Sequence, residues 1–66
     1  MLNRKEIGSR LRELRGKRTQ KEVANALGIT FSAVSSYELG NRVPSDEMKV
    51  KLANYYDVNV QDIFFK

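Results

Sequence analysis

Small polar side chains gather in one short stretch of the chain, between Thr19 and Gly40. Ser32, Ser35 and Ser36 follow closely on Thr30 and the aromatic Phe31. Hydroxyl groups bind polar partners readily, but they become nucleophiles only when a general base lies beside them. The chain has no histidine and no cysteine, so the commonest general base, the commonest metal ligand and every thiolate are missing. We therefore expect a binding surface and not an enzyme, with no catalytic residue, metal or cofactor, and a small hydrolase is the weakest reading.

Positive charge is concentrated in the first third of the chain. Residues 1–21 carry eight Lys and Arg against two acids, a net charge of +6, whereas the remaining residues contribute −2 to the total of +4. This polarised distribution favours an anionic partner, although a solvated helix face is the other reading of such a run. The eight basic residues are Arg4, Lys5, Arg10, Arg12, Arg15, Lys17, Arg18 and Lys21.

The composition is that of a globular chain, with 41% hydrophobic and 30% charged residues among 66. Its length predicts a single domain over residues 1–66. No apolar run approaches the roughly 20 residues that a membrane-spanning helix requires, and the charged start from Met1 to Glu6 leads into no signal-peptide core. We expect a cytoplasmic protein with no membrane contact.

Two short amphipathic segments are predicted to meet at Gly28. Thr19 is placed to cap the first, with Glu22 at the capping-box position, and Thr30 is placed to cap the second, over residues 31–39. Gly28 favours the turn between them, and Ala24 is small enough for a second helix to cross closely. This spacing predicts a helix-turn-helix, in which one helix projects from the fold. Its inner residues are Val23, Ala24, Leu27, Ile29, Val34 and Tyr37.

Three further segments complete the predicted fold, which is an all-α compact bundle of five short helices. One begins after Asn3, carries an apolar stripe and ends near Arg15, where Gly16 terminates it. Another begins after Ser45, and a last short helix begins after Asn59, which is placed to cap it. In the fourth helix we expect Met48, Leu52, Ala53, Tyr55 and Tyr56 on the inner face, and Lys49 and Lys51 on the outside.

The motifs TQKEVANALGIT, YELGNRVPS and KLANYYDVNVQDIF carry a resemblance that runs from about Ile7 to Phe64. In these motifs the chain resembles the Cro and phage-repressor type of helix-turn-helix regulators, the XRE family. The resemblance implies a lambda-repressor-like fold with the helix-turn-helix in helices 2 and 3. It also implies a sequence-specific transcriptional regulator, a repressor, that binds double-stranded DNA with residues 31–39 in the major groove. We expect a homodimer on a palindromic site, located at the nucleoid, and no small-molecule ligand.

The resemblance also implies roles for individual residues. Gln20 matches the glutamine that touches a phosphate and braces the start of the recognition helix, and Asn41 and Arg42 match the loop that meets the DNA backbone. Arg15 matches an arginine that pairs with the glutamate numbered Glu38 here. The expected DNA-binding set is Gln20, Thr30, Phe31, Ser32, Ser35, Ser36, Asn41, Arg42, Arg18 and Lys21, and the expected structural set is Arg15, Glu38, Ala24, Gly28 and Val34.

Several residues depart from the family pattern. Arg18 replaces an apolar residue after a short connection, so we expect its guanidinium to be free to meet phosphate. Phe31 replaces a polar reading residue and is left with apolar contacts, such as a thymine methyl group, or with packing against the fold. Leu39 also replaces a polar residue. This short supply of hydrogen-bonding groups supports an alternative, a protein-interaction module such as an antitoxin or anti-repressor. At Ile63 to Lys66, the two phenylalanines either close the core or place an aromatic at a dimer seam.

Overall fold

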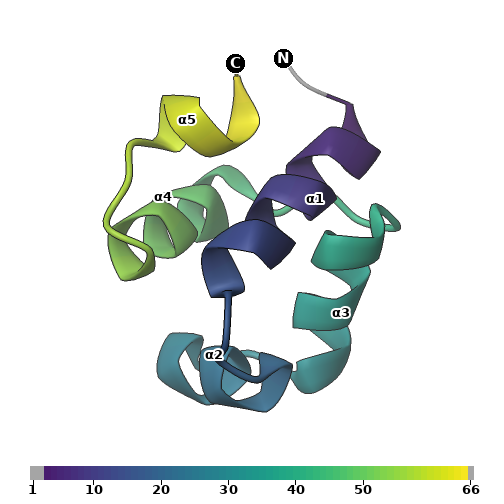
Figure 1. Cartoon of the computed structure of the whole chain (residues 1–66), viewed down its shortest axis with the longest axis vertical. Helices are drawn as coiled ribbons and strands as arrows, with labels where there is room; N and C mark the ends of the chain where they lie inside the picture. The colour runs from purple at the N-terminus through teal and green to yellow at the C-terminus, as the bar shows by residue number, and fades with distance from the viewer. Residues whose placement is uncertain (1–2, 66) are drawn as a thin grey trace.

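The computed structural model of the chain describes residues 3–65. Met1, Leu2 and Lys66, at the two ends of the domain predicted over residues 1–66, lie outside the described residues. Within residues 3–65 all regular structure is helical, so the predicted all-α bundle of five helices is confirmed (Figure 1). The helices are α1 (Arg4–Arg15), α2 (Gln20–Leu27), α3 (Phe31–Leu39), α4 (Asp46–Tyr55) and α5 (Val60–Phe64).

Side-chain caps fix where four of the helices begin. Each capping oxygen accepts a hydrogen bond from the backbone amide three residues later, which satisfies one of the unpaired amides of the first turn. The caps are Asn3 to Glu6 at 2.8 Å, Thr19 to Glu22 and Thr30 to Ala33 at 3.0 Å, and Ser45 to Met48 at 3.2 Å. Asn59 occupies the predicted N-cap position of α5, but its side chain makes no capping hydrogen bond.

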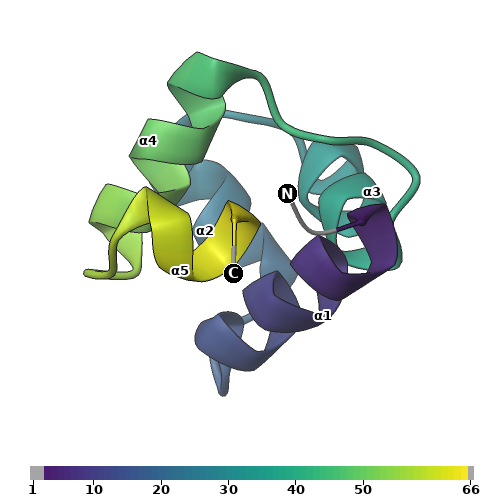
Figure 2. The same cartoon turned by 90° about the horizontal axis from the view of Figure 1, so that it is seen from above.

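The helices surround one apolar core. In both views α3 lies on one side of α1 while α4 and α5 lie on the other, and Figure 1 shows α2 across the base (Figures 1 and 2). Val23 from α2, Ile7 from α1 and both Ile63 and Phe64 from α5 are almost completely buried. The core therefore draws on every helix, and its larger members are Ile7, Leu11, Val23, Val34, Tyr37, Leu52, Tyr56, Ile63 and Phe64.

Helices α1 and α3 cross in direct backbone contact at Gly8. A Cβ atom at this position would overlap the carbonyl oxygen of Glu38 and would lie 2.9 Å from that of Tyr37. No side chain fits in this gap, so only glycine permits the crossing. The crossing holds the inner side of α3 against α1 and leaves its opposite side outward.

Lys49 is buried, which corrects the expectation that it lies outside with Lys51. Only 8% of Lys49 is exposed, and its Nζ atom lies 5.6 Å from the ring centroids of both Phe64 and Phe65. A cation over an aromatic face is attracted by the electron density of the ring. Of these two rings, Phe64 closes the core and Phe65 is half exposed, so the expectation that both phenylalanines close the core holds only for Phe64, and a dimer seam at Phe65 stays a prediction.

Candidate nucleic-acid interface

The outward face of α3 is lined by small side chains and one aromatic ring. Phe31 is 57% exposed, Ser32 is exposed, and Ser35 and Ser36 are half-buried. The inner face of the same helix holds Ala33, Val34 and Tyr37, all of which are buried. A helix with one anchored face and one face of short side chains can approach another surface closely.

Thr30 and Leu39 mark the two ends of this face. The Thr30 hydroxyl accepts the capping hydrogen bond, and its proton remains available for donation to a partner. Leu39 is 65% exposed and lies about two helical turns from Phe31, on the same side of α3. Both side chains line a groove between α3 and the start of α2. The outward face of α3 is therefore more apolar than its serines alone indicate.

Glu38 connects three helices through hydrogen bonds. Its carboxylate accepts from Arg15 Nε of α1 at 2.8 Å and from Gln20 Nε2 of α2 at 2.9 Å. The Glu38 side chain is 5% exposed and that of Arg15 is 18% exposed, so the ion pair is mostly shielded from water. The hydrogen bond to Glu38 raises the pKa of Arg15 further above its usual value, which keeps the guanidinium charged. The ion pair implied by the resemblance is present.

Gln20 braces a different part of α3 from the one expected. Its amide reaches Glu38, in the last turn of α3, and not the start of that helix. The side chain is half-buried beside the groove that Phe31 and Ser35 also line. Because one N–H of its amide nitrogen donates to Glu38, the orientation of the whole planar amide group is fixed, and its second N–H remains available as a donor.

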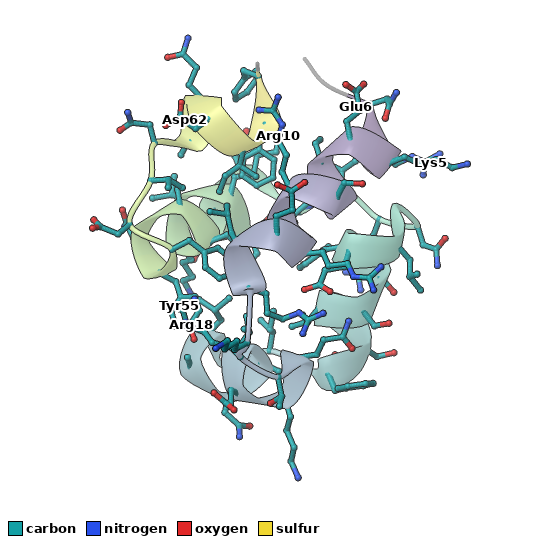
Figure 3. The ribbon with its side chains drawn as sticks, in the orientation of Figure 1. Lys5, Glu6, Arg10, Arg18, Tyr55 and Asp62 are labelled. Atoms are coloured by element: carbon teal, nitrogen blue, oxygen red, sulfur yellow. The ribbon has the colours of Figure 1, made fainter. Side chains whose placement is uncertain are left out.

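The exposed Arg18 has partners within the fold, whereas we expected its guanidinium to be free; phosphate binding by Arg18 stays a prediction. Its guanidinium carbon lies 5.4 Å from the ring centroid of Tyr55 and 5.7 Å from that of Tyr56, and its Nη1 donates to the Leu14 carbonyl at 3.2 Å. Figure 3 shows Arg18 extending toward Tyr55, away from α3. Burial, followed by the charge of Glu38, raises the pKa of Tyr56 to about 12. Arg18 thus joins the α1–α2 connection to α4.

The loop after α3 is anchored through its backbone. The amides of Asn41 and Arg42 both donate to the Ser36 carbonyl, at 2.9 and 3.3 Å, after Gly40 adopts the left-handed conformation with a φ of 81°. Both side chains are exposed, and the Arg42 guanidinium lies 5.5 Å from the Tyr37 ring centroid. Lys21 is exposed near the start of α2 and lines the groove beside α3.

Three of the expected structural residues lie where the fold needs a small or buried side chain or a left-handed backbone. Ala24 and Val34 are each 3% exposed, and Gly28 ends α2 with a φ of 68° that side-chain-bearing residues rarely adopt. Gly8 was missed, although a glycine inside an amphipathic helix costs about 1 kcal/mol relative to alanine and thereby signals close packing.

Residues 3–65 contain neither a group of metal-binding side chains nor a helix suited to crossing a membrane. No group of three His, Cys, Asp or Glu residues in this range is placed to hold a metal ion. None of the described helices combines the length and the apolar character required to cross a bilayer.

Comparison with known proteins places this geometry in a family. A family model described as helix-turn-helix matches residues 9–63. The chain is 37% identical over 59 residues to the cryptic phage CTXphi transcriptional repressor RstR of Vibrio cholerae, across 86% of this chain and 53% of that repressor. It is 39% identical over 62 residues to the HTH-type transcriptional regulator ImmR of Bacillus subtilis (strain 168), across 91% of this chain and 49% of that protein.

A third relative comes from an archaeon. The chain is 33% identical over 46 residues to the uncharacterized HTH-type transcriptional regulator MJ0272 of Methanocaldococcus jannaschii, and the match covers 70% of each protein. The chain spans about half the length of RstR and ImmR, so the comparison concerns their helix-turn-helix portions. The family match, these identities and the Gly28 turn between α2 and α3 agree, and the chain belongs to the XRE-type helix-turn-helix family.

Proposed function

We propose that this chain is a DNA-binding domain, over residues 1–66, of a transcriptional regulator that places α3 in the major groove of double-stranded DNA. The observation that carries the proposal is the outward face of α3, where Phe31 and Ser32 are exposed while the inner face is locked in the core. The major groove is about 12 Å wide and admits one α-helix. The related RstR is named a transcriptional repressor, which supports repression here.

Contacts with the DNA backbone would set the register of α3. Lys21 and Arg42 are exposed cations, and Asn41 and Gln20 offer amides beside the helix. Such contacts position a protein on DNA without reading its sequence. One N–H of the Gln20 amide nitrogen donates to Glu38, so the second N–H of the same nitrogen is the group that would donate to a phosphate.

Base recognition would depend on short contacts. Phe31 can only make apolar contacts, for which a thymine methyl group is the suitable target, and Ser32, Ser36 and Thr30 can donate or accept single hydrogen bonds. Ser35 lies nearer the groove beside α2 and completes the set. None of these side chains has the paired donor and acceptor of glutamine or asparagine. Shape and methyl content of the DNA therefore supply much of the specificity.

One α3 reads only a few bases, so we propose a symmetric homodimer on a palindromic site, with half-sites about one helical turn apart. The proposed location is the cytoplasm, at the nucleoid. An antitoxin or anti-repressor that uses α3 to bind protein is the competing function.

Selection of bound duplexes from a random pool tests the proposal directly. We expect an enriched sequence with two symmetric half-sites, and binding that weakens steeply between about 50 and 200 mM salt as counterions return to the DNA. Replacement of Ser32 and Ser36 by alanine should change the selected sequence with little effect on the melting temperature. Absence of binding to any duplex at low salt would exclude the DNA-binding function and favour the protein-interaction module.

A further inference from the structure

The first turn of α1 lies against the C-terminal end of α3. A Cβ at Gly40 would be 3.3 Å from the backbone of both Arg4 and Lys5, and Arg4 Nη1 donates to the Asn41 carbonyl at 3.4 Å. Lys5 extends outward on the side of the bundle where α3 lies (Figure 3). Arg4, Lys5 and Arg42 therefore share one end of α3 although they are far apart in the sequence. We name these three residues the α3-end cluster.

The charge of the α3-end cluster is not neutralised within the described part of the chain. All three side chains are exposed, and the ion pairs recorded for residues 3–65 involve other residues. The nearby C-terminal end of α3 has a dipole equivalent to about −0.5 elementary charge, which offsets only a small part of three positive charges. The ring of Tyr37 orients Arg42 without removing its charge. An anion beside this cluster would relieve the remaining repulsion.

We infer that the first turn of α1 is an additional DNA-backbone contact, in which Arg4 and Lys5 act with Arg42 on the phosphates of one strand. The inference rests on the proposed function of α3. A helix about 10–12 Å in diameter fills the roughly 12 Å width of the major groove, so a seated α3 lies between the two bordering backbones and residues that flank its C-terminal end are close to one of them. Gly40 holds the first turn of α1 close to that end of α3.

Salt titration of the variants Lys5→Gln and Arg4→Gln tests the inference. The probes are a fluorescein-labelled duplex of roughly 24 base pairs from the selection and a random duplex of equal length. Each lost phosphate contact should lower the slope of log affinity against log salt by about 0.9, which corresponds to about eightfold weaker binding at 0.1 M salt. Because phosphates are present in every sequence, both duplexes should lose affinity by the same factor.

Lys51→Gln is the matched control, because it removes the same charge from exposed α4, on the other side of α1 from α3 (Figures 1 and 2). At 0.1 M salt the screening length is about 10 Å, so this control should change affinity less than about twofold. The Lys5 side chain is exposed and has no hydrogen bond or ion pair with the rest of the described chain, so Lys5→Gln should leave the melting temperature unchanged.

A Lys5→Gln slope equal to that of Lys51→Gln would overturn the inference. A loss confined to the selected duplex would also overturn it, because the cluster would then act on base reading. If the unmodified chain binds neither duplex, the proposed function fails and the inference fails with it. Equal losses on both duplexes with a reduced slope support the α3-end cluster as a backbone contact.

Discussion

Replacement of Arg15 by methionine should destabilise the fold strongly, because it leaves the carboxylate of Glu38 with one donor in place of two. The Glu38 side chain is 5% exposed, and after the change only the Gln20 amide, at 2.9 Å, still binds it. Breaking a buried ion pair by removing one partner costs about 3–5 kcal/mol. Since 18% of the Arg15 side chain remains in contact with water, we expect a cost at or just below the lower end of this range, about 2–3 kcal/mol.

Thermal and urea unfolding followed by circular dichroism measure this effect. For a domain of this size each kcal/mol shifts the melting temperature by about 4–8 °C, so Arg15→Met should lower it by on the order of 10–20 °C. The second variant, Arg15→Met with Glu38→Met, should be more stable than Arg15→Met alone, because no unpaired buried charge remains. Arg12→Met is the matched control: Arg12 is an exposed arginine on the same helix and its side chain has no recorded partner among residues 3–65, so its loss should not change stability measurably.

Two results would refute this reasoning. An Arg15→Met chain with an unchanged melting temperature would show that water solvates Glu38 well enough to replace the guanidinium. A double variant that is less stable than Arg15→Met would show that the pair contributes more to the fold than the apolar side chains that replace it.

Three other predictions follow from single positions. Gly8→Ala should lower the free energy of unfolding by more than about 2 kcal/mol, because backbone atoms of α3 must move to make room for the methyl group. Ser9→Ala, at an exposed position of the same helix, should not lower it. Equal free energies of unfolding for the two variants in urea would contradict the close crossing. Tyr56 keeps its proton in the folded state up to about pH 12 but loses it near pH 10 when unfolded. The free energy of unfolding should therefore fall between pH 10 and 12, by on the order of 2–3 kcal/mol. The Tyr56→Phe variant should not show this fall in the free energy of unfolding. Parallel profiles of stability against pH for the two chains would show that Tyr56 does not cause the fall. Replacing a contacted thymine by deoxyuridine should weaken DNA binding by the unmodified chain about fourfold, because one buried methyl group is lost. The same replacement should not change the affinity of the Phe31→Ser variant. Equal losses of affinity for the two chains in a fluorescence polarisation assay would show that Phe31 does not contact the base.

The helix boundaries were predictable because local chemistry determines them. Thr19 and Thr30 accept the expected capping hydrogen bonds, and Gly28 and Gly40 end their helices with positive φ. Each of these features depends on residues within one turn of the chain. The inner faces followed in the same way from the spacing of Val34 and Tyr37.

The placement of long side chains was not predictable, because it depends on elements distant in the sequence. Periodicity placed Lys49 on the outside of α4, but α5 returns over this position and buries it beneath Phe64 and Phe65. Arg18 was expected to be free because the α1–α2 connection is short, but the end of α4 supplies two tyrosine rings within reach. The Arg15–Glu38 pair was found only through the family resemblance, since no local pattern joins residues 23 apart.

The residues that anchor α3 in the core lie on one side of the helix, and its exposed residues lie on the other. Changes to the exposed residues can therefore alter what the helix binds without changing how the chain folds. Ala33, Val34, Tyr37 and Glu38 provide the contacts that hold the helix, whereas Phe31 and Ser32 are exposed to solvent. New side chains could be grafted onto the outer positions, for example glutamine at 31 or arginine at 32, without disturbing the core. The scaffold should therefore accept a library of altered specificities in which nearly every member folds.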